Sequence, residues 1–314
     1  MNSKEIRFSI IIIHRNNFDR LSKTLESVFK YKQVNDEIIV IDNFSSDESI
    51  KTLEKTYSLN EIKIIKNSCN AGYGFACNQG MHAANGEFFL LCNNDIELKS
   101  DTLEKFEIFL KLDPFAGLIG PQIFSPMGQK MNSYSTQAPG LISQLDLIGR
   151  PYRSKKINKF DRVSTLRGAC LAVNRKMTNE LGMYDEEFYF YHEETEWCIR
   201  INKSKRWKVM FAPEIQISHF GGASSSTLFL ESRIEFFRSR LIFWSKVFPR
   251  YKVLILYLWN IPKIILDFLF YLLLTIITIG MNRKFKNKLI DRSVQIAWLI
   301  SGKPDSWGLP NKCI

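Results

Sequence analysis

The stretch "GEFFLLCNND", residues Gly86–Asp95, is the most informative segment of this 314-residue chain. Its apolar run, 88–92, is typical of a strand that is covered on both faces, as in the middle of a parallel sheet. The run ends abruptly in Asn93, Asn94 and Asp95. These three residues either form a turn that caps the next helix or carry a carboxylate to a ligand site. The rest of the chain has to distinguish these two interpretations.

The remainder of the first half alternates between strand and helix patterns. We predict strands at 7–14, 36–42, 61–67 and 87–93, and helices at 19–31, 45–57 and 74–85. Such alternation with short connections indicates βαβ units, so we predict an α/β fold with a Rossmann-like, mostly parallel central sheet. Ligands of such sheets bind beyond the carboxyl ends of the strands. His14, Asp42, Asn67 and Asp95 all fall at such ends.

The second half is less regular and ends in helical sequence. Residues 114–166 contain one predicted strand, 117–124, among loop-like segments. A strand, a short helix and an acidic helix start follow within 167–213. We predict two domains, a sheet-based domain at 1–225 and a C-terminal helical, membrane-associating region at 226–314.

The C-terminal region contains the most apolar segment of the chain. The stretch 264–281 has 18 residues, which is near the lower length limit for crossing a bilayer. Three alternatives remain open: a helix lying on or partly in the membrane, a single span, and an ordinary core helix. The whole chain has a formal net charge of +11, and the segment from residue 252 onward contains nine Lys or Arg but only three Asp. Cations beside an apolar helix predict an anionic membrane surface as partner, and no nucleic acid.

The two ends of the chain and its cysteines bear on localisation. The start, "MNSKEIRF", does not have the pattern of a signal peptide. The six cysteines include no CxxC pair and no zinc-like spacing. We expect the protein at the cytoplasmic face of the inner (plasma) membrane, either peripheral or with one C-terminal hydrophobic helix inserted.

Three strand ends carry candidate donor-site chemistry. Asp42 either contacts the base or ribose of a nucleotide or only shapes its turn. The loop around Asn70 and Gly72 opens a helix with small residues, which suits a phosphate but also suits a flexible turn. Asp95 can hold a divalent cation against a diphosphate, because hard cations prefer oxygen ligands and accept phosphates as the remainder.

An acidic cluster follows four aromatic residues in "FYFYHEETEWCIR", residues 188–200. Glu193, Glu194 and Glu196 are either helix-start carboxylates stabilised by the helix dipole or a general base whose pKa is raised in an aromatic cleft. Downstream, His219 precedes two glycines in "ISHFGGAS". It is either a neutral metal ligand or a loop residue.

Taken together, these segments resemble family 2 glycosyltransferases of the GT-A fold, especially the bacterial rhamnosyltransferase-like branch. The matching elements, in order, are "FSIIIIHRNN", "VIDNFSSD", "NAGYGFACNQG", "GEFFLLCNND", "RGACLAVNR", "YDEEFYFYHEETEWCIR" and "HFGGAS". The resemblance extends from about Phe8 to about Phe248, and the ordered set is more specific than any single motif.

The resemblance implies roles for individual residues. Glu194 is the implied catalytic base with Glu193 beside it, and Asp95 and His219 are the implied ligands of Mg²⁺ or Mn²⁺. The implied nucleotide-sugar contacts are His14, Asn16, Asp42, Asn43, Asn70, Gly72, Asn78, Asn94, Asp95 and Arg167. Two departures stand out: the metal motif keeps only its last carboxylate, and the base is Glu where Asp is commoner.

The sequence therefore predicts an inverting, metal-dependent glycosyltransferase in bacterial surface polysaccharide synthesis. It would add one sugar, rhamnose as first choice, from a nucleotide diphosphate donor to a lipid-linked saccharide. Two alternatives remain. A nucleotidyltransferase lacks support because no Gly-rich basic loop follows the first strand, and a membrane-anchored nucleotide-sugar-binding protein without transferase activity is disfavoured by the acidic cluster.

Overall fold

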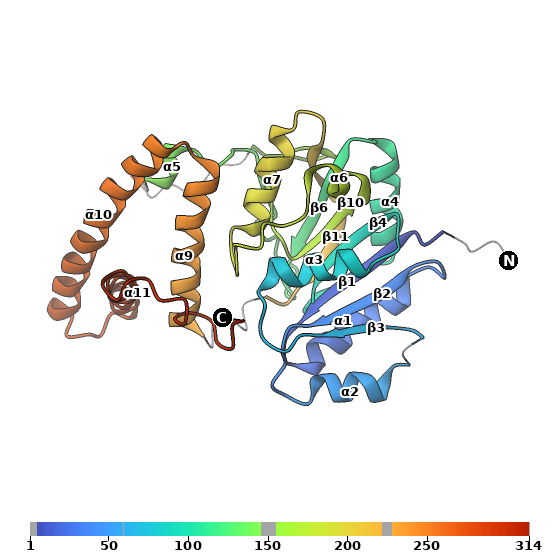
Figure 1. Ribbon diagram of the computed structural model, residues 1–314, viewed down its shortest axis with the longest axis horizontal. Helices are drawn as coiled ribbons and strands as arrows, with labels where there is room; N and C mark the ends of the chain where they lie inside the picture. Colours follow the sequence, from blue (N-terminus) through green and yellow to red (C-terminus); the bar gives the residue numbers. More distant parts are fainter. Residues whose placement is uncertain (1–4, 59, 146–154, 222–227, 314) are drawn as a thin grey trace. The chain divides into compact units, whose positions relative to one another are not determined.

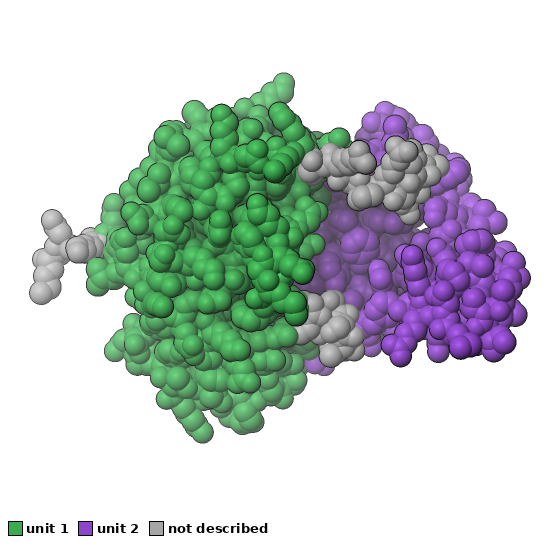
Figure 2. All heavy atoms as spheres, turned by 180° about the vertical axis from the view of Figure 1, so that it is seen from behind, with its two compact units in different colours: residues 1–138, 152–189, 193–221 green, residues 139–151, 190–192, 222–314 purple. Residues whose placement is uncertain are grey.

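The computed structural model describes residues 5–58, 60–145, 155–221 and 228–313 (Figure 1). The chain forms two compact units (Figure 2). The first unit comprises 1–138, 152–189 and 193–221, and the second comprises 139–151, 190–192 and 222–314. The predicted assignment of transferase and membrane roles to 1–225 and 226–314 stays a prediction.

A mixed sheet is the centre of the first unit. Within the described residues it has nine strands, in the order β3-β2-β1-β4-β10-β6-β11-β5, with β8 paired to β11. The strands are β1 (Phe8–His14), β2 (Glu37–Asp42), β3 (Lys63–Lys66), β4 (Phe88–Asn93), β5 (Ile96–Glu97), β6 (Ala116–Phe124), β8 (Asp161–Arg162), β10 (Cys170–Asn174) and β11 (Lys208–His219). A separate pair consists of β7 (Tyr134–Ser135) and β9 (Thr165–Leu166).

Strand direction confirms the predicted α/β class. Strands β3, β2, β1 and β4 are parallel neighbours, and β6 and β11 run the same way. Strands β10, β5 and β8 run in the opposite direction. In register, His14 lies opposite Asp42, and Ile13 lies opposite Asn93. The carboxyl ends of β1, β2 and β4 therefore meet at one edge, as parallel pairing requires.

Helices cover both faces of this sheet. They are α1 (Phe18–Tyr31), α2 (Ser49–Thr56), α3 (Tyr73–Ala83), α4 (Thr102–Leu112), α6 (Arg175–Leu181) and α7 (Glu193–Lys203). Alternate side chains of β1 enter two separate cores, because successive residues of a strand point to opposite faces. Ile10 and Ile12 pack with α1, α2 and α4, whereas Ile11 and Ile13 pack with α3, α6 and α7. The apolar run 88–92 of β4 is divided between the same two cores in the same alternating way.

The second unit is helical, as predicted for the C-terminal region. Its helices are α5 (Leu141–Gln144), α9 (Phe229–Val247), α10 (Arg250–Ile277) and α11 (Arg283–Ile300). Of the described helices, α10 is long and apolar enough to cross a membrane, judged by length and composition. Pro262 lies inside α10.

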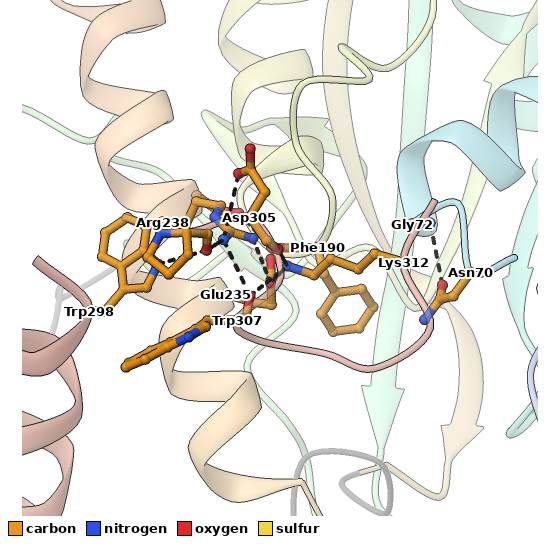
Figure 3. Close-up of polar contacts among 11 residues, drawn as sticks. Asn70, Gly72, Phe190, Glu235, Arg238, Trp298, Asp305, Trp307 and Lys312 are labelled. Carbon is orange, nitrogen blue, oxygen red and sulfur yellow. Dashed lines mark hydrogen bonds and ion pairs between the residues drawn. The ribbon is translucent and has the colours of Figure 1, made fainter. Parts of the chain in front are cut away.

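A charged cluster ties the chain end to α9 (Figure 3). Glu235 is fully buried, and its Oε1 accepts from Arg238 Nη1 at 2.9 Å and from the Lys312 ammonium. Arg238 also donates to the carbonyl of Pro304 at 2.7 Å and lies over the ring of Trp298. A buried carboxylate needs such partners, so the cluster holds α9, α11 and the C-terminal segment together.

Candidate active site

Asp95 and His219 come together at the end of β4. Asp95 is buried, and its Oδ1 lies 3.0 Å from His219 Nε2. The approach does not have hydrogen-bond geometry, and both Asp95 Oδ1 and His219 Nδ1 are buried atoms without a hydrogen-bond partner. The antiparallel pairing of β11 with β5 places His219 opposite Ile96, directly after Asp95. The pairing explains how residues 124 positions apart meet.

This pair suits a divalent cation. Two ligands at about 2.1 Å from a metal, in adjacent octahedral positions, lie about 3.0 Å apart. A buried carboxylate oxygen without a hydrogen bond is costly unless it has a ligand, because desolvation is uncompensated. Within the described residues no group of three or more His, Cys, Asp or Glu side chains forms a metal cluster. Asp95 and His219 would therefore leave the remaining positions to water and substrate phosphate.

Arg20, which sequence reasoning missed, is a third charged group at this point. Its Nη1 lies 3.6 Å from Asp95 Oδ2, and its side chain is 30% exposed. It lies in the first turn of α1, after the N-cap residue Asn17, whose side chain accepts from the Arg20 amide at 3.2 Å. A cation that reaches the metal-side carboxylate and remains accessible can also bind a diphosphate. Nothing in the local sequence distinguishes Arg20 from a surface arginine.

A chain of hydrogen bonds links the half-buried Asn94 to the buried His14. The side-chain amide of Asn94 donates to His14 Nδ1 at 2.9 Å, and His14 Nε2 lies 2.8 Å from Ser49 Oγ. Ser49 Oγ in turn donates to Asp47. Burial lowers the pKa of His14 to about 4, against the opposing effect of Asp47. His14 is therefore neutral near pH 7, and its Nδ1 is the acceptor that holds Asn94.

Asn16 connects the same edge to the loop after β2. It has a left-handed backbone with φ 60°, and its amide donates to Ser45 Oγ at 2.9 Å. Its side-chain oxygen accepts from the amide of Ser46 at 2.8 Å. Its carbonyl accepts from Asn94 Nδ2 at 3.3 Å. Asn16 thus fixes the first loop of the predicted donor site.

Asp42 and Asn43 occupy the end of β2. Burial raises the pKa of Asp42, and hydrogen bonds from Ser45 oppose this shift. Asn43 is buried, and its Nδ2 donates to Asn70 Oδ1 at 2.9 Å and to the Gly72 carbonyl at 3.2 Å. Asn43 therefore holds the asparagine–glycine loop, while Asp42 keeps a carboxylate at the sheet edge.

The asparagine–glycine loop uses its own amides internally. The amide of Ala71 donates to the side chain of Asn43. The amide of Gly72 donates to Asn70 Oδ1 (Figure 3). The amide of Tyr73 donates to the carbonyl of Tyr189 at 2.9 Å. Gly72 has φ +89°, and a Cβ there would lie 2.5 Å from that same carbonyl. The close backbone approach accounts for the glycine, and the nucleotide-sugar contact at Gly72 stays a prediction.

Asn78 has a different set of partners from the other predicted donor contacts. It is buried on α3 and exchanges hydrogen bonds with the backbone of Tyr184, at 2.9 and 3.0 Å. Its Nδ2 also donates to Glu186 Oε1 at 2.8 Å. These bonds fasten the segment that leads to the acidic cluster, so Asn78 has a positioning role in this structure.

The acidic cluster starts helix α7, as predicted. Two consecutive residues with left-handed backbone, Tyr191 and His192, precede it. Glu193 is buried, and Glu193 Oε2 and Glu194 Oε2 are buried atoms without hydrogen-bond partners. Burial raises the pKa of Glu194, and burial together with the charge of Glu194 raises the pKa of Glu193 well above its usual range. Glu196 differs, because it is paired with Arg200 at 2.9 Å.

A short backbone segment links this acid pair to the end of β4. A Cβ on Gly168 would lie 3.5 Å from Glu194 Cβ, so the backbone there packs against the glutamate. The next carbonyl, of Ala169, accepts from the amide of Asn93 at 3.0 Å. Arg167 is exposed and lowers the pKa of Glu194, against the larger effect of burial. Gly168 thus packs against the predicted base, Glu194, and the next residue, Ala169, bonds to the end of β4, which leads to the predicted metal ligand Asp95.

Comparison with protein families and characterised proteins gives two kinds of match. The family model of glycosyl transferase family 2 matches residues 9–182, more than half of the chain. The low-salt glycan biosynthesis hexosyltransferase Agl10 of Haloferax volcanii is 26% identical over 196 residues, covering 59% of this chain and 62% of that protein. N-acetylglucosaminyl-diphospho-decaprenol L-rhamnosyltransferase of Mycobacterium tuberculosis is 24% identical over 181 residues, covering 50% and 58%. The chain thus spans about three fifths of the length of these relatives.

Solved structures share the fold at lower identity. A mannosyltransferase from Pyrobaculum calidifontis, in complex with GDP-Man and Mn²⁺, has a TM-score of 0.56 and 15% identity, over 95% of this chain and 87% of that one. GalNAc-T7 with UDP, GalNAc and Mn²⁺ has a TM-score of 0.55 and 19% identity, over 69% and 44%. These likenesses confirm the predicted GT-A-like fold.

Proposed function

The chain belongs to glycosyl transferase family 2, and we propose on this basis that it transfers one sugar from a nucleotide diphosphate donor to a hydroxyl of a lipid-linked saccharide. The names of two relatives support this class, one a hexosyltransferase and the other a rhamnosyltransferase of a decaprenol diphosphate acceptor. Rhamnose is the first donor sugar to test, followed by UDP-hexoses. The setting is bacterial surface polysaccharide synthesis.

The observation that carries the proposal is Glu194 Oε2, a buried carboxylate oxygen without a hydrogen-bond partner, beside the Gly168–Ala169 segment that bonds to β4. A base with a raised pKa is better matched to proton abstraction near neutral pH. Glu194 Oε2 takes the proton of the acceptor hydroxyl as that oxygen attacks the anomeric carbon, with inversion of configuration. Glu193 is buried beside it, and burial together with the charge of Glu194 raises the pKa of Glu193 well above its usual range. The exposed Arg167 lowers the pKa of Glu194, against the larger effect of burial.

On the donor side, Asp95 and His219 would hold a divalent cation, Mg²⁺ or Mn²⁺. When bound, such an ion supplies positive charge that stabilises a departing nucleoside diphosphate. Arg20 adds a cation at the same place. Asp42, at the end of β2, remains the proposed contact to the nucleotide base or ribose. His14, Asn16, Asn43 and Asn94 position the loops that surround it.

We propose the cytoplasmic face of the plasma membrane as the place of the reaction, because the acceptor is lipid-linked. No nucleic acid is expected as partner.

Donor binding is the experiment that tests this function. Purified protein is titrated with deoxythymidine diphosphate-rhamnose and UDP-hexoses, with and without Mn²⁺, alongside Asp95→Ala and the control Asp101→Ala. We expect one donor to bind in a metal-dependent way. Asp95→Ala should weaken this binding by more than about 10–100-fold, because loss of a residue that merely supports a metal ligand already costs that much in metal affinity. Asp101 pairs with Lys105 on a helix surface, so its variant should bind normally.

Two outcomes would contradict the proposal. No binding of any donor by folded protein would favour a non-enzymatic role. Release of pyrophosphate without sugar transfer would favour a nucleotidyltransferase.

A further inference from the structure

Helix α10 has two chemically opposite faces. One face is an apolar stripe, defined as the exposed apolar residues between 254 and 277. Leu258, Leu266 and Ile276 are representative members, with 67%, 65% and 64% exposure. The stripe recurs every three to four residues, so at about 100° per residue it occupies less than half of the helix circumference.

The opposite face of α10 carries its polar residues, which point toward α9 and α11 of the same unit. Asn260 is buried, and its side chain accepts from Arg240 at 3.2 Å and donates to the Leu256 carbonyl at 2.9 Å. Asp267 accepts from Lys263 at 2.8 Å. A helix on the surface of a water-soluble domain has the reverse arrangement, with apolar residues inward. The medium outside α10 is therefore expected to be apolar.

The position of α11 decides whether α10 can cross a bilayer. Arg292 of α11 bonds to Asp267 Oδ2 through Nη2 and Nε, at 3.0 and 3.1 Å. These bonds, together with α10–α11 packing, place α11 along the inward face of α10. Helix α11 also carries Arg283, Lys284, Lys286 and Lys288 in its first two turns. A crossing α10 would draw these charges into hydrocarbon, which is strongly unfavourable.

The charges around the stripe indicate which apolar medium covers it. Arg283, Lys284 and Lys286 are exposed after the end of α10, and Arg250 is exposed at its start. Cations at both ends of an apolar face suit anionic lipid headgroups over an acyl layer. A second copy of the chain would bring like charges together at the same face, which disfavours a homodimer.

We propose that α10 lies flat in the interface of an anionic bilayer, with its apolar stripe among the acyl chains and α11 on the cytoplasmic side. The helix does not cross the membrane. This inference rests on the proposed function, which places the lipid-linked acceptor at the membrane. The sequence left open whether the helix is peripheral or inserted, and the proposed geometry is a helix that lies flat in the interface.

Vesicle binding tests the face. The full chain is floated with vesicles of phosphatidylcholine alone and of phosphatidylcholine mixed with phosphatidylglycerol. The double variant Leu266→Asp/Leu273→Asp should bind at least about tenfold more weakly, given the burial free energy of each leucine. The control Leu112→Asp changes a leucine of α4 that is 68% exposed, and it should bind normally. Equal binding of both variants would overturn the assignment of the stripe.

Charge reversal tests the lipid. Arg283→Glu/Lys284→Glu should remove the preference for phosphatidylglycerol, and binding by the unmodified chain should weaken as salt rises. If the stripe instead joins two copies, light scattering will show a dimer that Leu266→Asp/Leu273→Asp dissociates, without any vesicle binding. That result would overturn the lipid assignment.

Topology tests the orientation. The full chain, tagged at both ends, is expressed in bacteria, and sealed inside-out membrane vesicles are treated with protease. A flat α10 leaves both tags accessible on the cytoplasmic side. A protected C-terminal tag with an accessible N-terminal tag would show a crossing helix and refute the proposal.

Donor titration separates this inference from the proposed function. Leu266→Asp/Leu273→Asp should bind the sugar nucleotide with unchanged affinity in solution, because its changes lie outside the first unit. Loss of vesicle binding with normal donor binding supports the inference. Absent donor binding together with normal vesicle binding contradicts the proposed function alone.

Discussion

The sheet edge of the first unit and helix α10 of the second are both incompletely satisfied, in opposite ways. At the edge, Asp95, His219, Glu193 and Glu194 each keep a buried polar atom without a hydrogen-bond partner. On α10, large apolar side chains remain exposed. Buried polar atoms without partners and broad exposed apolar faces are each unfavourable in an isolated protein. Each region therefore indicates a partner of its own chemistry, a charged ligand for the sheet edge and an apolar phase for α10.

The largest expected effect concerns the acid pair. Glu194→Gln keeps the size of the side chain and removes its ability to accept a proton. We expect kcat to fall by about 10²–10⁴-fold, the usual contribution of a general base, with donor affinity unchanged. Steady-state kinetics and donor titration measure the two quantities.

A matched control for that variant lies two residues further along α7. Glu196 is engaged by Arg200. Glu196→Gln should keep kcat within a few-fold and reduce stability by at most about 1 kcal/mol. If both variants lose kcat equally, Glu194 is not the base.

The next effect contrasts the two faces of α10. Ile264 is 4% exposed, whereas Leu266 is 65% exposed. Ile264→Ala should lower the free energy of unfolding of the second unit by about 2–5 kcal/mol, because it opens a cavity. Leu266→Ala should change it by no more than about 0.5 kcal/mol in the absence of lipid. Denaturant unfolding followed by hydrogen exchange in α10 measures both, and similar losses would show that the stripe is packed in solution.

The smallest effect is a pH dependence of stability. The folded-state pKa of Glu193 is raised by burial, so the folded state holds a proton that the unfolded state has already released. Stability from this group is full below the unfolded pKa, near 4.5, and is lost as pH rises toward the folded pKa. Glu193→Gln should therefore flatten the decline of stability above pH 4.5. An unchanged decline would assign the pH dependence to other groups.

Several features of the site were predictable because they depend on local pattern. The strand and helix periods placed His14, Asp42 and Asp95 at carboxyl ends of parallel strands, and parallel pairing then brings those ends together. The acidic start of α7 was likewise visible in the sequence. The order of the motifs led to the family that the comparisons show.

Other features depended on contacts between distant segments. The meeting of His219 with Asp95 requires the pairing of β11 with β5. The use of Asn43 and Asn78 as internal braces, and the approach of Arg20 to Asp95, involve side-chain directions that residue spacing does not encode. The site residues carried over from the resemblance stay predictions until donor binding tests them.

Periodicity and motif order along the chain are enough to assign the fold class, the family and an apolar C-terminal helix. Which face of that helix points outward depends on its contacts with other helices. An almost uniformly apolar sequence has no preferred face until another helix binds its few polar residues, and here Arg292 of α11 binds Asp267. The packing of one charged side chain thus turned a segment with three possible interpretations into an oriented surface.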